Sequence, residues 1–426
     1  MPASLARRQI ADKAEITAHD SAGDGKGGAA GEGGQSVAVF ARAAAATTPA
    51  RPAPPLPSLL ATLDAHAAFL LWTAIIGAGL LGLPVAWLTI ALFARSAAGL
   101  AAGLAATAAT AWLALAPLPA EGEPPPPAAA ALCSYLITRT LAFLHVQADG
   151  SPALRVLCAP GADAAIAAAA GAATPLLVVA EPHSVLPLAV LLAFHPAAQP
   201  LIHPAHRPPQ ALVGSRLLAS SACFAVPLVR HVWWWLGLRP ADRATVRAGL
   251  AAAATGAGPP ALALCPGGVA EVAFLTPTPP PPLPKTETLF LTARTGFVRE
   301  ALRAGAALLP AFCLGQTALF RWTHPPLLPR PALERLARAI GFMPLWAHNG
   351  WGAPLPVRGA SLTLLVGGPV EGTAGGSGSG GGGEDSDPSH ARVVAVRDRY
   401  ISDLVGLVRG MQGGVAGEEG TRVVVV

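Results

Sequence analysis

The segment from Glu181 to Pro187, with the sequence EPHSVLP, brings a carboxylate, a proline and a histidine together directly after the charge-free run 174–180. That run predicts a fully buried strand. Ionisable side chains beyond it are poor core material, but they are expected where an open α/β sheet presents functional groups, at the carboxyl ends of its strands. A single histidine in such a turn is more commonly structural, so a functional interpretation of His183 depends on the rest of the chain.

A second apolar run, residues 261–265, predicts another buried strand, which ends at the turn Pro266-Gly267-Gly268 and is followed by Glu271. Glycines allow backbone to approach a ligand closely, so Gly267 and Gly268 are candidate ligand-binding residues. Glu271 is the candidate carboxylate that orients the His183 imidazole. Glu181 competes for that role, although a proline lies between it and His183. The structural alternative for Glu271 is a carboxylate that serves the dipole of a helix N-terminus.

Two arginines, Arg294 and Arg299, flank Gly296 at the start of a predicted helix. Guanidinium groups in this position suit a phosphorylated ligand, so all three residues are candidates for binding one. A solvated basic face beside Glu300 is the alternative of equal weight.

Other polar and aromatic groups carry weaker signals. The HxxH pair His203 and His206 has no cysteine or carboxylate cluster beside it, so we expect loop histidines and no metal site. The aromatic stretch 231–235 suits a membrane interface or the lining of an apolar channel, while core packing is the commoner fate of such residues.

The composition is that of an apolar chain with few charges: of 426 residues, 52% are hydrophobic and 12% charged. The formal charge of +5 is carried almost entirely by arginine. It suits anionic lipid headgroups or a phosphorylated ligand, and the absence of a basic stripe with interleaved aromatics argues against nucleic acid. The cysteines are odd in number and widely spaced, which predicts reduced, mostly buried side chains in a protein facing the cytosol.

Two charge-free runs, residues 67–94 and 96–120, are each long enough to cross a bilayer as a helix. We predict a membrane-embedded helical hairpin, and Pro84 and the glycines before it also allow a re-entrant form of the first run. Residues 1–60 contain no apolar signal segment and predict a disordered tail. Arginines precede the first run, which places the N-terminus in the cytosol, and an even number of spans returns the rest of the chain there.

Beyond the prolines at 124–127 the pattern alternates between apolar strands and helices. It predicts an α/β domain with a mixed sheet flanked by helices. Further strands are expected at 307–315 and 362–366, and helices at 240–254, 296–304 and 391–409. We assign this α/β domain to residues 131–410, with inserted loops at 276–284 and 372–390, and a C-terminal tail to 411–426.

Several blocks in fixed order resemble the type-2 diacylglycerol acyltransferase family in its plant and algal form, over most of residues 67–410. They are EPHSVLP at 181–187, SSACFAVPLVRHVWWWLGL at 220–238, CPGGVAE at 265–271, RTGFVREA at 294–301, PAFCLGQ at 310–316 and VGGPVE at 366–371.

The resemblance implies a glycerolipid-acyltransferase-like fold. It also implies an enzyme of the endoplasmic-reticulum membrane whose catalytic domain faces the cytosol, with lipid droplets as a second location. It also implies transfer of the acyl group of acyl-CoA to diacylglycerol, with acyl-CoA as co-substrate and no other cofactor. His183 suits this reaction as general base for the attacking hydroxyl, and backbone N–H groups at the following helix start would stabilise the oxyanion. Arg294 and Arg299 would bind the coenzyme.

The sequence departs from the family pattern at some positions. Val179-Ala180 replaces Phe-Gly, and Leu188 stands where related glycerol-phosphate acyltransferases carry an aspartate, so the carboxylate that orients the imidazole must come from elsewhere. The acceptor alternatives are monoacylglycerol and a long-chain alcohol. A non-catalytic lipid-binding scaffold is the alternative of another class, and self-association into a homo-oligomer is left open.

Overall fold

The structure is a computed structural model that describes residues 59–93, 96–147, 153–272, 286–325, 328–357, 360–373, 387–415 and 421–426. Residues 1–58 of the tail predicted at 1–60, the insertion at 276–284 and most of the insertion at 372–390 lie outside these residues, whereas Leu59 and Leu60 begin the first described helix. The described residues from Leu59 to Val425 belong to one compact unit.

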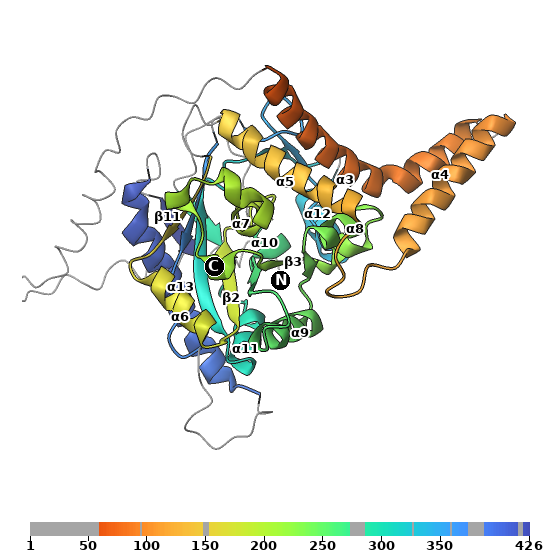
Figure 1. Cartoon of the computed structure of the whole chain (residues 1–426). Helices are drawn as coiled ribbons and strands as arrows, with labels where there is room; N and C mark the ends of the chain where they lie inside the picture. Colours follow the sequence, from red (N-terminus) through yellow and green to blue (C-terminus); the bar gives the residue numbers. More distant parts are fainter. Residues whose placement is uncertain are drawn as a thin grey trace, which may run out of the picture. The chain divides into compact units, whose positions relative to one another are not determined.

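A seven-stranded sheet organises the fold, in the order β1-β10-β7-β2-β5-β3-β4 (Figure 1). All neighbouring pairs are parallel except β10 with β7, which are antiparallel. The sheet is therefore mixed, as the sequence predicted. Its strands are β1 (Leu154–Cys158), β2 (Leu176–Glu181), β3 (Arg216–Ala219), β4 (Arg239–Pro240), β5 (Ala261–Leu264), β7 (Ala307–Leu314) and β10 (Leu362–Val366).

Two smaller two-stranded sheets accompany it. Parallel strands β6 (Thr286–Leu289) and β11 (Arg422–Val425) form one, and antiparallel strands β8 (Arg321–Thr323) and β9 (Trp346–His348) form the other. The segment predicted as a C-terminal tail thus contributes a strand.

The helices cover both faces of the main sheet. They are α3 (Leu59–Phe93), α4 (Ala97–Leu115), α5 (Pro127–Gln147), α6 (Ala162–Gly171), α7 (Leu188–Phe194), α8 (Val229–Trp235), α9 (Arg243–Ala254), α10 (Gly268–Val272), α11 (Gly296–Arg303), α12 (Arg330–Ile340) and α13 (His390–Met411). Short 3-10 turns lie at 196–201, 204–206, 210–212, 221–225 and 412–414.

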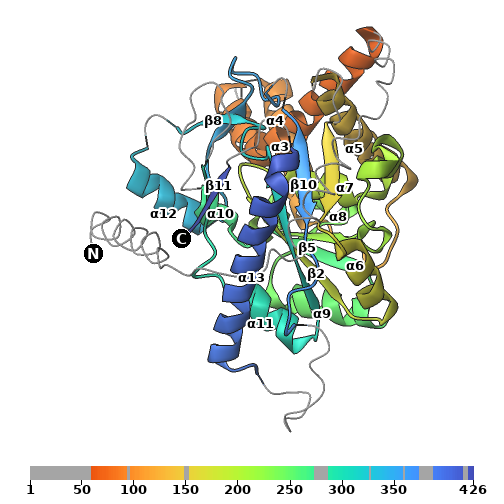
Figure 2. The ribbon, with the colours of Figure 1, turned by 90° about the vertical axis from the view of Figure 1, so that its left-hand side faces the viewer.

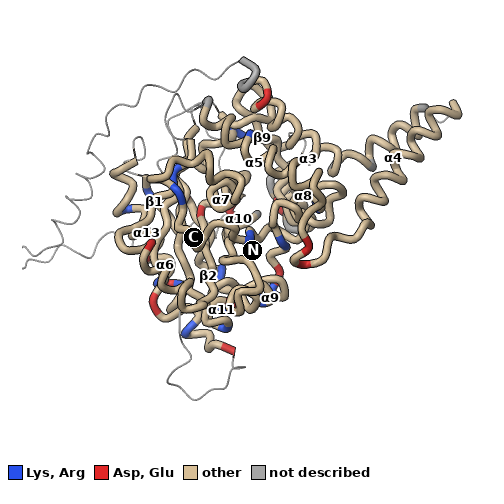
Figure 3. Tube along the Cα trace, viewed as in Figure 1, with Lys and Arg blue, Asp and Glu red and all other residues tan. Residues whose placement is uncertain are grey.

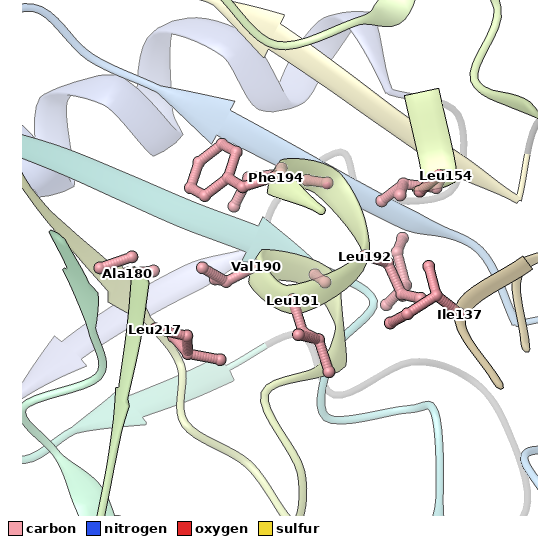
Figure 4. Close-up of a cluster of buried hydrophobic side chains, with 14 of the residues drawn as sticks. Ile137, Leu154, Ala180, Val190, Leu191, Leu192, Phe194 and Leu217 are labelled. Atoms are coloured by element: carbon pink, nitrogen blue, oxygen red, sulfur yellow. The ribbon is translucent and has the colours of Figure 1, made fainter. Parts of the chain in front are cut away.

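Alternation along the strands divides the core into two apolar layers. Leu176, Val178 and Ala180 of β2 face a layer that includes α5, α7 and α8, whereas Leu177 and Val179 face α9, α11 and α13. Side chains of α7 pack between the sheet and α5 (Figure 4), and α13 runs across the opposite face (Figure 2). Each large apolar side chain buried in this way contributes about 1.5–3 kcal/mol.

The strand predictions at 174–180, 261–265, 307–315 and 362–366 correspond to β2, β5, β7 and β10. The helix expected from residue 240 begins at Arg243, because Pro240 belongs to β4 and the Asp242 side chain accepts the backbone N–H of Thr245 as N-cap. The helix expected at 391–409 corresponds to α13, which buries Val393, Val396, Tyr400, Leu404 and Leu407.

The first charge-free run forms one bent helix. The segments Leu63–Gly79 and Pro84–Leu92 of α3 meet at 68°, and Pro84 explains the bend because it donates no backbone hydrogen bond. The first segment contributes Ala65, Phe69 and Ile75 to the core. It is therefore partly a core helix, which the sequence did not predict.

The second segment of α3 packs against α4 as a hairpin (Figure 1). Gly103 lets the helices approach, since a Cβ there would lie 2.3 Å from Ile90 Cγ1. The described residues of this hairpin carry no charge (Figure 3), and it exposes large apolar side chains at Leu81, Val85, Trp87, Leu88, Leu92, Leu104, Trp112 and Leu115.

Two helices in the described residues are long and apolar enough to cross a membrane, α4 and Pro127–His145 of α5, and the bent α3 makes a third if counted as one span. Of the α4 window only 6% is buried, against 44% for α5. This exposed apolar surface indicates that the protein associates with a membrane through α4 and the adjacent part of α3.

We predict that Leu104→Arg on α4 shifts the protein from the membrane pellet to the supernatant after an alkaline wash. A charge near the centre of a membrane helix costs about 2.5–3.5 kcal/mol, so several-fold less protein should stay in the pellet. Leu336→Arg is the matched control, because Leu336 is an exposed leucine of α12. Equal membrane retention of both variants would contradict insertion of α4.

Candidate active site

The carboxyl ends of three neighbouring strands meet at one edge of the sheet. Strand β2 ends at Glu181, and its parallel neighbours β5 and β7 end at Leu264 and Leu314. Each strand is followed by a segment that carries candidate groups: residues 182–187 after β2, the glycine turn after β5, and Gln316 after β7. Open α/β proteins place their sites at such an edge.

Glu271 reaches across from the β5 side to His183. Its Oε1 accepts the backbone N–H of His183 at 2.7 Å, and only 1% of Glu271 is exposed. The structure thus brings the two residues together. The bond goes to the main chain of His183, however, so Glu271 positions the residue and the ring takes its orientation from another group.

That group is the carbonyl oxygen of Ser184, which lies 2.8 Å from His183 Nδ1. A carbonyl oxygen can only accept, so we assign the proton to Nδ1, which leaves the Nε2 lone pair available as a base. The ring is half-buried. Its removal from water lowers the pKa of the imidazole, and the Ser184 carbonyl opposes part of this shift.

Glu181 lies fully buried beneath the same turn, and its Oε1 accepts the backbone N–H of Gly267 at 3.0 Å. Burial and the neighbouring Glu271 carboxylate raise the pKa of Glu181 well above its ordinary value. Burial also raises the pKa of Glu271, against the opposing effect of Glu181 and of backbone N–H groups at His183, Phe290 and Ser184. Neither carboxylate contacts the imidazole through a hydrogen bond recorded among the described residues.

The candidate glycines differ in their surroundings. A Cβ on Gly267 would lie 1.9 Å from Glu271 Oε2. That carboxylate therefore fills the space beside Gly267 and leaves no room there for a ligand. Gly268 has φ +54°, a conformation that favours glycine. A Cβ on Gly268 or Gly296 would meet nothing within 4 Å, so these two glycines face open space.

The two candidate arginines differ in the groups that they contact. Arg294 lies at the site: its Nη2 donates to Gly267 O at 3.3 Å, its guanidinium lies 5.1 Å from the Phe290 ring centroid, and its buried Nε has no partner. Arg299, one turn along α11, pairs with Asp387 at 2.9 Å. Its role in coenzyme binding stays a prediction.

Gln316 was not singled out by residue chemistry, although it ends one of the sequence blocks. Gln316 is only 1% exposed. Its side-chain Oε1 accepts the backbone N–H of Ala189 at 3.3 Å, and its Nε2 donates to Leu186 O. Its main-chain carbonyl accepts the Ser184 hydroxyl at 3.2 Å. It therefore clamps the His183 turn from the β7 side. A glutamine directly after a fully buried strand was the available signal.

These contacts bear on the expectation that backbone N–H groups near the start of the following helix stabilise the oxyanion. The amides of His183 and Ala189 are both engaged by side-chain oxygens, so neither is free to donate to a substrate. Ser184 has φ +54°, which a non-glycine residue adopts only when its surroundings hold it there. The bonds from Glu271 and Gln316 supply that restraint.

The remaining candidates lie apart from these contacts. His203 and His206 have ring centroids 5.5 Å apart, and no group of three or more His, Cys, Asp or Glu side chains suited to a metal occurs in the described ranges. The stretch 231–235 forms α8, in which His231 and Val232 are buried and the tryptophans are half-buried. All five cysteines are free.

Comparison with known proteins agrees with these blocks. A family model described as diacylglycerol acyltransferase matches residues 172–394. A mouse (Mus musculus) protein, "Acyl-CoA wax alcohol acyltransferase 2", is 35% identical over 104 residues, which cover 24% of this chain and 28% of that protein. The match thus spans under a third of the relative's length. No solved structure matches.

We predict that Gly267→Ala disrupts the site, because the added methyl would displace the Glu271 carboxylate from beneath His183. The loss of stability should be on the order of 1–3 kcal/mol, the cost of leaving buried polar groups unpaired, measured as a lower unfolding temperature. Gly406→Ala on α13 is the control, since its Cβ would meet nothing within 4 Å. Equal stability of the two variants would contradict the packing described.

Proposed function

The chain belongs to the diacylglycerol acyltransferase family, and on that premise we propose that it transfers the acyl group of acyl-CoA to the free hydroxyl of diacylglycerol, forming triacylglycerol. Family membership and the murine relative support the coarser conclusion of an acyl-CoA-dependent O-acyltransferase. The finer proposal draws on the family's description and on the geometry around His183.

One observation carries the mechanism: His183 Nδ1 is occupied by the Ser184 carbonyl, so Nε2 is the basic nitrogen. In the proposed reaction Nε2 takes the proton of the acceptor hydroxyl as its oxygen attacks the thioester carbon. The C–S bond then breaks, and the imidazolium returns the proton to the sulfur, which releases free coenzyme A. Glu271 acts on His183 through its backbone N–H, Glu181 holds the adjacent Gly267 turn, and both are positioning residues in this scheme.

Arg294 is the proposed positive group nearest this turn. Its Nε is a buried donor with no partner, and its Nη2 is tied to the turn carbonyl of Gly267. It can therefore serve either the developing oxyanion or a coenzyme phosphate. Gly268 and Gly296, which face open space, are proposed to allow the coenzyme to approach the backbone. Arg299 would join them only by exchanging Asp387 for a phosphate.

The membrane context favours a lipid acceptor. The exposed apolar hairpin holds the chain at a bilayer, where diacylglycerol is dissolved, so substrate can enter from the leaflet. We propose the endoplasmic-reticulum membrane on the basis of the family resemblance, and a catalytic domain in the cytosol because arginines precede the first apolar run.

A long-chain alcohol is the second candidate acceptor, because the murine relative is named for a wax alcohol. The two acceptors present the same attacking group, a hydroxyl beside a long apolar chain, so the base and its supports would serve either. Expression in cells that lack storage lipid, followed by separation of neutral lipids by class, distinguishes triacylglycerol from wax ester.

We predict that His183→Ala lowers acyl-CoA consumption by about 10²–10⁴-fold, the usual contribution of a general base. The assay follows release of free coenzyme A thiol from membranes supplied with diacylglycerol, at matched protein abundance. His203→Ala is the control, because His203 is an exposed loop histidine. Triacylglycerol synthesis by the His183→Ala variant at the rate of the control would refute the assignment.

The pH dependence follows from the lowered pKa of His183. The base works only when neutral, so activity should be present at neutral pH and fall as the pH drops through the imidazole pKa. Because burial lowers that pKa, the acid limb of kcat/KM should lie below the ordinary histidine value of about 6.5. An acid limb above that value would contradict a buried neutral base.

A further inference from the structure

Glu181 and Glu271 form a buried pair in which one oxygen of each carboxyl group has no hydrogen-bond partner. The Oε1 atoms accept backbone N–H groups, Glu181 from Gly267 and Glu271 from His183. The Oε2 atoms of both residues are buried and have no hydrogen-bond partner. Unpaired buried carboxylate oxygens are costly, so two in neighbouring side chains call for a common cause.

Gly267 shows how close the two groups lie. Its N–H is bound to Glu181, while its Cα faces Glu271 Oε2 so closely that a methyl group there would lie 1.9 Å from this oxygen. One residue thus touches both carboxyl groups. The strands behind them, β2 and β5, are direct parallel neighbours.

The surroundings supply little positive charge to support two anions. Besides His183, the titratable groups that interact with the pair are the Cys265 thiol, directly after β5, and the Tyr400 hydroxyl of α13, which donates to Val179 O at 3.2 Å. Burial and the two glutamates raise the pKa values of both groups. The half-buried Arg294 guanidinium approaches through Gly267 O. Two carboxylates sharing such a site cannot both ionise.

We propose that Glu181 and Glu271 share one proton between their Oε2 atoms, that Glu181 holds it, and that this singly charged pair is the device that positions His183. A neutral carboxylic acid on Glu181 can donate from Oε2 to Oε2 of Glu271. A single proton therefore satisfies both orphaned oxygens. The positioning role rests on the function proposed above; the shared proton does not.

The neighbours decide which residue holds the proton. The Glu271 carboxylate is surrounded by backbone N–H groups of His183, Ser184 and Phe290, and each favours its ionised form. Glu181 is fully buried. The charge therefore rests on Glu271, against the His183 amide, where a charge-assisted hydrogen bond is stronger than a neutral one.

The test compares Glu181→Gln, Glu181→Met and Glu271→Gln in the full-length protein in lipid nanodiscs. Glutamine at 181 reproduces the neutral acid, because its carbonyl accepts from Gly267 and its NH₂ donates to Glu271. It should retain about a third or more of wild-type kcat. Glu181→Met should lose about tenfold or more because it removes the hydrogen bond of the pair, and Glu271→Gln should lose as much because it takes the charge away from the His183 amide.

Infrared spectroscopy gives a readout that does not depend on activity. The spectra are recorded in a detergent without ester groups, because the ester carbonyls of nanodisc lipids absorb in the same region. The wild-type protein should then show the carbonyl stretch of a neutral carboxylic acid at neutral pH, and Glu181→Gln should lose it. Persistence of that band in Glu181→Gln would overturn the proposal, as would activity of Glu181→Gln as low as that of Glu181→Met. Full activity of Glu271→Gln beside loss in Glu181→Gln would overturn the assignment of the proton to Glu181.

Stability adds a third measurement with a definite sign. A folded state that binds one more proton than the unfolded chain loses stability as pH rises above the ordinary glutamate value. The wild-type unfolding temperature should therefore fall between about pH 5 and pH 8 more steeply than that of Glu181→Gln. If wild-type protein consumes no acyl-CoA, the proposed function fails, while the infrared and stability results still decide the shared proton.

Discussion

The hydrogen bond from the His183 amide to Glu271 is the contact on which the arrangement of the site depends. It joins the turn after β2 to the turn after β5, and Gln316 joins the same β2 turn to the end of β7. The segment that carries the imidazole is thus held from both neighbouring strands. This double restraint makes a positive φ at Ser184 tolerable, and that backbone conformation accompanies the contact of the Ser184 carbonyl with His183 Nδ1.

A core of small and branched apolar residues makes these restraints precise. Strand β2 is buried along its entire length, with alternate side chains in the two apolar layers. Close packing of that kind leaves the strand little freedom to shift its register. Glu181, the last residue of β2, is fixed by the same packing, so its carboxyl group lies against Gly267 without a flexible segment between them.

Much of the sheet was predictable because its central strands are continuous apolar runs bounded by turn residues, as in β2, β5 and β10. The edge strands β1 and β4 were not, because Arg155 and the Arg239–Pro240 pair interrupt the pattern. The β-branched run Val423–Val425 favours a strand, but its position in a predicted tail concealed it. Helix α5 was hidden because the prolines before it suggested a linker.

The proximity of His183 and Glu271 was predictable from parallel strand ends, but the atoms that meet were not. Strand order places residues at an edge, whereas side-chain rotamers decide whether a carboxylate reaches a ring or an amide. Arg299 illustrates the same limit, since its partner Asp387 is 88 residues away and no local pattern links the two.

The first segment of α3, which leads into the membrane hairpin, belongs to the same core as the sheet. Phe69 and Ile75 of α3 belong to the same buried cluster as Val178 and Ala180 of β2. Helix α8 joins this contact: Trp233 packs against Trp72, and Arg230 donates to Ala114 O at the end of α4. Packing, in place of a flexible linker, therefore joins the hairpin to the domain that carries the turn after β2. In the function proposed above, this attachment keeps the imidazole close to the membrane in which the acceptor lipid is dissolved.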